Sequence, residues 1–166
     1  MEKEGGDIPI IEQILFSGKQ NIPWKDVEIY LKQYIGNIFI VEKYQDPIVI
    51  GSDFPDEYTG SGYTKSLRGA SAKAKANAVQ IIGTLIGAAV NRRWIENKDN
   101  KHKKDASGGW YRYDAVFEIV VKGSQETTDR VNRYNVTLVV RKAREGLFLY
   151  DMINIKKEAS RPLESK

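Results

Sequence analysis

The chain has 166 residues, of which 41% are hydrophobic and 29% are charged, the length and composition of one ordinary globular domain. It has no cysteine and a single histidine, His102, which excludes disulfide scaffolds, thiolate nucleophiles, cysteine-ligated zinc and mechanisms that need two histidines. No apolar run approaches the roughly 18 residues that a membrane span requires, so we expect a soluble chain without a membrane span, and the net charge of +4 favours a polyanionic partner.

The N-terminal part is expected to contain two helices and a hairpin. Apolar residues are dense over residues 8–16 and are followed by a serine and a glycine, which predicts a short helix closed by glycine. Helical spacing over residues 24–35, with a proline before and a glycine after, predicts a second helix. The β-branched and aromatic runs at 37–44 and 47–54 predict a two-stranded hairpin, and residues 55–62 have the composition of a loop.

Residues 64–90 form the longest segment with helix-forming composition, and this segment carries Lys73 and Lys75. On a helix these two lysines are about 200° apart, so one can point toward a site while the other is solvated. Gly83 and Gly87 each cost about 1 kcal/mol relative to alanine inside a helix. We therefore expect a break between two helices, or a short kinked helix, near these glycines.

The most basic stretch of the chain follows at residues 92–106 and contains His102. Histidine is the side chain whose ordinary pKa, near 6.5, suits it to exchange a proton at neutral pH. His102 is therefore the candidate general acid or base, and the alternative is a solvated surface histidine. The cations of this stretch are Arg92, Arg93, Lys98, Lys101, Lys103 and Lys104.

From Trp110 onward the hydrophobic period changes to two, which predicts a half-buried strand over about 110–121. Two further alternating runs, at 133–141 and 147–155, predict an antiparallel meander of at least three strands. The expected fold class is α+β: N-terminal helices and a β-hairpin, then a helical segment packed on the antiparallel β-meander. Residues 1–62 form a helical and hairpin lobe and residues 63–166 the core, unless both form one compact domain.

Aromatic and cationic residues alternate where the first long strand begins, at Trp110, Tyr111, Arg112 and Tyr113. Such interleaving offers base stacking and phosphate contacts together, as recognition of single-stranded RNA requires. The alternative is that the two tyrosines are core residues of the strand, which is the stronger reading for Tyr113. Cations near the ends of the later strands are expected to converge with these residues at one sheet edge: Arg141, Lys156, Lys157 and Arg161.

Metal and cofactor chemistry has little support in the sequence. Asp53, Asp56 and Glu57 cluster after a strand, but this is also the composition of a solvated turn. Phosphate-cradling and dinucleotide-binding glycine motifs are absent. We therefore expect no metal and no cofactor.

The order of elements, with the string HKKDASGGWYRYD at residues 102–114, resembles the barnase/EndoU/colicin/RelE-like ribonuclease superfamily. The runs KAKANAVQ, RYNVTLVVR and LYDMINIKKEAS are similar to its phage- and mobile-element-associated branch, whose members are modules of large polyvalent phage proteins or toxin tips. The resemblance extends over residues 8–163. It implies a small α+β fold and metal-free cleavage of RNA.

The resemblance also implies roles for particular residues. His102 would be the general acid or base, and Lys73 or Lys75 the helix-borne cation. Arg112 and Arg141 would be clamps for the phosphate or the transition state, and Tyr113 or Tyr150 a stacking or proton-relay group. Ala159 stands where we associate a threonine with this family, which either weakens this copy or is neutral. Further substrate contacts are expected from Arg92, Arg93, Lys101, Lys104, Trp110, Tyr111, Tyr150 and Lys156.

Two functions of different classes remain open. The first is a metal-independent endoribonuclease toxin domain that cleaves RNA, with tRNA among the candidate substrates, by attack of the ribose 2′-hydroxyl on the adjacent phosphate. Such a domain would act in the cytoplasm, or in a target cell's cytoplasm when delivered within a larger protein, and an acidic immunity protein would cover its basic cleft. The second is a non-catalytic module of a phage or mobile-element protein that binds nucleic acid or protein through the surface of residues 92–104.

Overall fold

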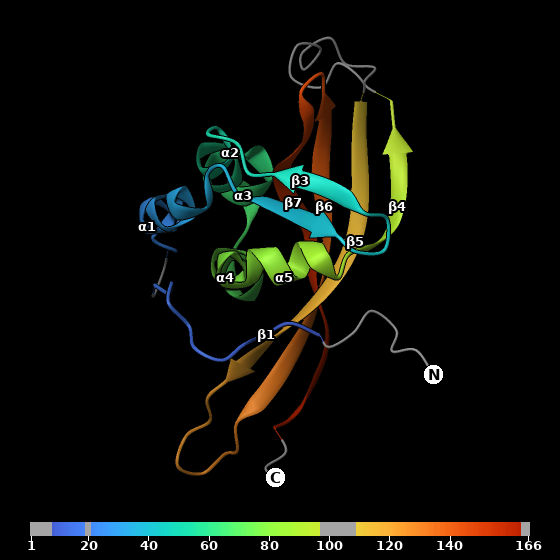
Figure 1. Cartoon of the computed structure of the whole chain (residues 1–166). Helices are drawn as coiled ribbons and strands as arrows, with labels where there is room; N and C mark the ends of the chain where they lie inside the picture. The colour runs from blue at the N-terminus through green and yellow to red at the C-terminus, as the bar shows by residue number, and fades with distance from the viewer. Residues whose placement is uncertain (1–7, 19–20, 97–108, 164–166) are drawn as a thin grey trace, which may run out of the picture.

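Three long antiparallel strands form the centre of the protein. The computed structural model describes residues 8–18, 21–96 and 109–163. Within them, β5 (Gly109–Val121) pairs with β6 (Arg130–Ala143), and β6 pairs with β7 (Gly146–Pro162). Figure 1 shows these strands running the length of the molecule. The predicted meander is therefore confirmed.

Shorter strands extend this sheet on both sides. β4 (Val90–Ile95) pairs antiparallel with the first part of β5, and β1 (Ile10–Ile11) pairs parallel with a later part. At the other side, β3 (Asp46–Val49) lies parallel to β7 and carries β2 (Ile38–Val41) as the outermost strand. The predicted hairpin is confirmed, and its second strand joins the main sheet.

The helices lie together on one side of the long strands (Figure 1). Two one-turn 3₁₀ segments, Lys32–Tyr34 and Val79–Ile81, follow α1 and α4. None of the helices in the described part of the chain is long and apolar enough to cross a membrane. The helices are α1 (Trp24–Leu31), α2 (Phe54–Gly60), α3 (Gly62–Ser66), α4 (Gly69–Ala78) and α5 (Ile82–Gly87).

The hydrophobic core lies between these helices and one face of the sheet. Strand alternation places Tyr113, Ala115 and Phe117 of β5 on this face, where they are buried with Leu138 of β6 and Leu85 of α5. The residues on the other face of β5 are absent from this cluster. Residues 8–62 and 63–163 both contribute to the core and to the sheet, so the fold is a mixed α+β structure in which both segments pack together.

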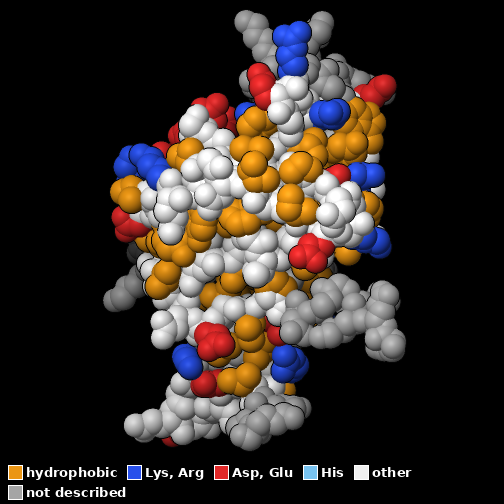
Figure 2. Space-filling model, viewed as in Figure 1, with side chains coloured by type: hydrophobic (Ala, Val, Ile, Leu, Met, Phe, Trp, Pro, Cys, Tyr) orange, Lys and Arg blue, Asp and Glu red, His pale blue; other side chains and the backbone are white. Residues whose placement is uncertain are grey.

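Hydrophobic side chains also reach the surface. Figure 2 shows them over β2 and β3, where Ile38 and Ile40 on the outermost strand are 57% and 41% exposed. Charged side chains lie mostly around the margins of the same view.

Two predictions for the N-terminal part are wrong. Residues 8–16 are extended rather than helical, because their backbone finds partners in tertiary structure: the Glu118 amide donates to the Pro9 carbonyl, and the Asn77 side chain bonds the amides of Leu15 and Phe16. Residues 55–62 are not a loop but include most of α2. A proline at the start of α2 and acidic residues in its first turn favour this helix.

The segment 64–90 is helical as far as Gly87, with an unpredicted break at Leu67 and Arg68 between α3 and α4. The predicted break near the glycines is present but precedes them. It lies at Val79–Ile81, and both Gly83 and Gly87 are inside α5. Gly83 is required by packing, because a β-carbon there would lie 2.7 Å from the ring of Phe39 on β2. The close approach of α5 to the hairpin therefore explains a glycine within a helix.

Candidate functional site

The sheet face that points away from the helices carries two predicted arginines. We call it the outer face; on β5 it holds Trp110, Arg112 and Asp114. The strand register pairs Arg112 with Val139 and Trp110 with Arg141, so the two arginines are diagonal neighbours on adjacent strands. Val139 is buried without belonging to the main hydrophobic core, because its neighbours on the outer face cover it.

Neither arginine is neutralised within the described residues. No carboxylate there forms a salt bridge with Arg112 or Arg141, and the Nε atom of each is buried without a hydrogen-bond partner. Arg141 lies over the ring of Phe148 at 4.8 Å, which holds its guanidinium group against the sheet. A buried donor without a partner costs about 1–3 kcal/mol. The two guanidinium charges therefore have no balancing carboxylate among the described residues.

Aromatic side chains stand beside this arginine pair. Trp110 and Tyr150 meet edge to face, with ring centroids 5.0 Å apart. Tyr150 lies two residues after Phe148, the partner of Arg141, and so shares the outer face. It is also the extra residue of a bulge, because Val139 is opposite Asp151 and Val140 is opposite Leu149. The outer face thus combines two cations with two aromatic rings.

The outer face continues past the arginine pair toward the middle of the sheet. Arg93 pairs with Asp114 at 2.9 Å, and both side chains are more than 40% exposed, so this cation already has a partner. Beyond it lies a hollow of about 620 Å³, lined in part by Val116, Asn135 and Thr137. The chemistry of the face therefore changes from cationic and aromatic to polar along the strands.

Other predicted residues lie on the helix-covered side of the sheet. Tyr113 is fully buried and its hydroxyl donates to Asp46 at 2.7 Å; burial, strengthened by this carboxylate, raises the pKa of Tyr113 far above its ordinary value. Arg92 also pairs with Asp46, at 2.9 Å, and stacks on Tyr44 and Tyr111. The stacking or relay role predicted for Tyr113 is therefore not available on the outer face, since successive strand residues point to opposite sides.

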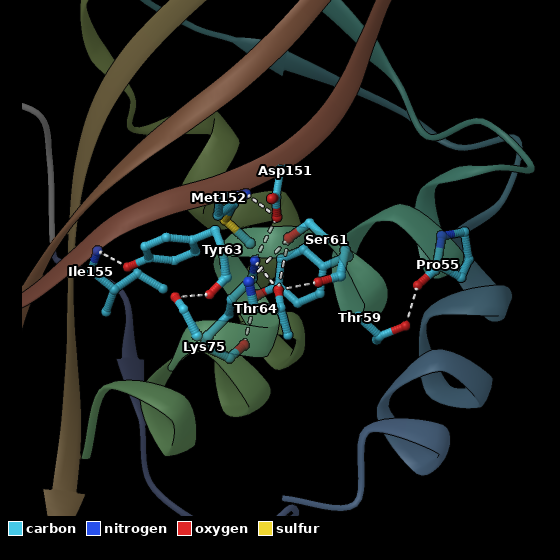
Figure 3. Close-up of polar contacts among 11 residues, drawn as sticks. Pro55, Thr59, Ser61, Tyr63, Thr64, Lys75, Asp151, Met152 and Ile155 are labelled. Atoms are coloured by element: carbon cyan, nitrogen blue, oxygen red, sulfur yellow. Dashed lines mark hydrogen bonds and ion pairs between the residues drawn. The ribbon is translucent and has the colours of Figure 1, made fainter. Parts of the chain in front are cut away.

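Lys75 is inside the protein rather than at a surface site (Figure 3). Its Nζ donates to Asp151 at 2.5 Å and to the hydroxyl of Thr64 at 2.6 Å. The ammonium lies 4.5 Å from the ring of Tyr58, whose hydroxyl donates to the Lys75 carbonyl. Burial lowers the pKa of Lys75 and raises that of Asp151, while the ion pair opposes both shifts. This network joins α2, α3, α4 and β7, and it has no exposure to a substrate.

The sequence prediction that one of the two helix lysines is solvated is confirmed, since Lys73 is exposed while Lys75 is buried. The buried carboxylate was missed. A signal was present, because Asp151 interrupts an otherwise apolar strand run, and a lone acid at such a position usually has a buried partner.

The predicted convergence of strand-end cations at one edge is wrong. Arg141 lies opposite Phe148 near the β6–β7 turn, whereas Arg161 lies opposite Val131 at the far end of the same pair of strands. Arg161 there bonds Glu118, which also pairs with Arg133. Lys156 is exposed opposite Asn135, between these two positions. The long strands separate residues that the sequence places at strand ends.

The predictions for His102, Lys101 and Lys104 lie outside the described residues. In the chain they belong to the connection between β4 and β5, whose flanking residues Ile95 and Trp110 are paired. Among the described residues, no group of three histidine, aspartate or glutamate side chains is placed to hold a metal ion. The predicted acidic turn at Asp53, Asp56 and Glu57 instead belongs to the start of α2.

Comparison of the chain with protein-family models, curated proteins and solved structures finds no match.

Proposed function

We propose that the chain binds single-stranded RNA on the outer face of its sheet and cleaves it without a metal ion. The observation that carries this proposal is the pair Arg112 and Arg141, which lacks anionic partners among the described residues and lies beside Trp110 and Tyr150. Guanidinium groups bind phosphate in a bidentate manner. Aromatic rings stack on unpaired bases at about 1–3 kcal/mol each.

The proposed reaction is a transesterification. A base removes the proton of the ribose 2′-hydroxyl, the 2′-oxygen forms a bond to phosphorus, and the bond from phosphorus to the 5′-oxygen breaks as that oxygen is protonated. The products are a 2′,3′-cyclic phosphate and a 5′-hydroxyl end. Arg112 and Arg141 would stabilise the charge that develops on phosphorus oxygens, and His102 would serve one of the two proton transfers. Tyr150, which lies beside the arginine pair, would assist in place of the buried Tyr113.

A non-catalytic RNA-binding module is the second candidate, and one observation favours it. The described part of the outer face supplies cations and rings near the arginine pair, but its carboxylate there, Asp114, is already paired with Arg93. Binding would then use the same residues without a proton acceptor. His102 would have no effect on the RNA.

The test is an assay on total cellular RNA in excess EDTA, combined with binding of a short single-stranded RNA over a range of salt concentrations. The variants are His102→Ala and the double variant Arg112→Gln/Arg141→Gln. Lys142→Gln is the matched control, because Lys142 is an exposed cation next to Arg141 in the chain and on the other face of β6.

A nuclease gives fragments with the wild type and the Lys142 control, and none with His102→Ala. The double variant should bind RNA more weakly, and its affinity should fall less steeply with salt concentration, by the amount expected for the loss of about two phosphate contacts. Binding without cleavage, unchanged in His102→Ala, would establish the module instead. No RNA binding by the wild type would refute both functions.

A further inference from the structure

A large hollow in the described structure is remote from the outer-face arginines. It has a volume of about 1070 Å³ and lies between the segment before α1, the α3–α4 junction and the far ends of β5 and β6. At β5 it reaches Val121, nine residues along the strand from Arg112, a separation of about 30 Å. We call it the α4 cleft. Its volume is near the upper end of the range for small-molecule sites.

The charge of the α4 cleft is strongly one-sided. Four cations line it, against Glu12 as its one carboxylate among the described residues: Lys65, Arg68, Lys73 and Lys122. The lining therefore carries an excess of three positive charges, four cations against one carboxylate.

The cations of the cleft are weakly engaged within the described structure. Arg68 donates to the backbone carbonyls of Lys65 and Leu67 rather than to a carboxylate. Lys122 approaches Asp129 at 3.6 Å, with both side chains on the surface, and such pairs contribute little. Lys65 and Lys73 have no salt bridge to a described carboxylate. An anion in the cleft would meet cations that are not already neutralised.

The walls of the cleft are apolar. Ile14, Ile22 and Leu67 line it, together with the aromatic side chains of Trp24 and Tyr134. All but Tyr134 are half-buried, so they offer an apolar surface next to the cations. Sites for small organic ligands combine such walls with a few charged groups.

We propose that the α4 cleft binds a small organic phosphate with an aromatic body, of the class of nucleoside mono- and diphosphates. The apolar and aromatic walls contact the ring system, and Arg68 and Lys73 bind the phosphate. This site does not depend on the ribonuclease proposal, because it uses different residues at a different part of the sheet. It gives the protein a second, separate ligand.

Isothermal titration calorimetry on the full chain tests the site, with ADP, adenosine and pyrophosphate as probes. The variant is Arg68→Gln/Lys73→Gln, and Lys142→Gln is again the matched control. We expect ADP to bind more tightly than adenosine, which lacks the phosphates, and more tightly than pyrophosphate, which lacks the ring system. The double variant should lose at least tenfold in ADP affinity while the control binds as the wild type does.

Three results would overturn the site. They are the absence of ADP binding at millimolar concentration, equal affinity for ADP and adenosine, and unchanged ADP affinity in the Arg68/Lys73 variant. A loss of ADP affinity in Arg112→Gln/Arg141→Gln, with none in the cleft variant, would place the nucleotide on the outer face. Thermal denaturation of each variant shows whether a loss of binding reflects unfolding.

Discussion

Replacing Lys75 with methionine should strongly destabilise the protein. The variant keeps a similar side-chain volume but leaves the Asp151 carboxylate in a place where only 4% of its side chain is exposed. Removing one partner of a buried ion pair costs about 3–5 kcal/mol, because the remaining charge has no compensation. At roughly 2–4 °C per kcal/mol for a chain of this size, the melting temperature should fall by roughly 6–20 °C.

The second part of this prediction concerns Lys75→Met/Asp151→Leu. Exchanging both partners for apolar residues removes the buried charge altogether, and such exchanges are often neutral or stabilising. The double variant should therefore recover most of the lost stability. In the single variant the stability deficit should shrink as the pH falls, because burial raises the pKa of Asp151 and protonation relieves the unpaired charge.

Urea unfolding followed by circular dichroism measures both variants, and the coupling energy follows from the double-mutant cycle. A cost below about 1 kcal/mol for Lys75→Met, or additive costs in the double variant, would contradict the reasoning. RNA binding provides a separate readout. If Lys75 is structural, the folded double variant binds RNA like the wild type, whereas a catalytic or substrate-binding Lys75 would make it defective.

Three further predictions concern stability. Tyr58 and Tyr113 are fully buried, and burial raises the pKa of each above 10, so the stability that they contribute is complete below pH 10 and is lost as the pH rises above it. Above pH 10 each tyrosine should lower the free energy of unfolding by about 1.4 kcal/mol per pH unit, and replacing either with Phe should make this loss less steep in urea unfolding at a series of pH values. Asn77→Ala should lower the free energy of unfolding by about 2–4 kcal/mol, because it removes three hydrogen bonds to the backbone of residues 15–16. Hydrogen exchange of the Leu15 and Phe16 amides should accelerate more than exchange of amides in β6. Gly83→Ala should destabilise the protein by about 1–3 kcal/mol despite the higher helix propensity of alanine, because the new β-carbon would lie 2.7 Å from the Phe39 ring. If thermal denaturation showed a stabilised variant instead, the Phe39 ring would have to move aside.

Local patterns in the sequence were enough to find the meander and the hairpin. Along residues 113–119 every second residue is apolar and buried, while the residues between them are polar except Val116. This pattern predicts a strand with one buried face, because the pleat has a period of two. The same rule placed Arg112 opposite in face to Tyr113. Helix geometry in the same way predicted that Lys73 and Lys75 point in different directions, because it fixes the angle between residues two positions apart.

The sequence could not predict where distant segments find their partners. Residues 8–16 have an apolar composition that suits a short helix, but Asn77 and the edge of β5 provide hydrogen bonds that hold them extended. The Lys75–Asp151 pair joins residues 76 positions apart, one on α4 and one on β7. Such contacts are decided by tertiary packing, which overrides local preference.

The candidate site was likewise predicted in part from the sequence and in part only from the structure. Residue types and their order were enough to select the candidate side chains: arginines interleaved with aromatics, one histidine and no thiol. Which of them meet depends on the strand register, which places Arg112 beside Arg141 on the outer face, and on tertiary packing, which pairs Arg92 with Asp46 on the helix-covered side. The length of the strands then separates Arg141 from Arg161, since register and rise along a strand, and not order in the chain, set the distance between two side chains.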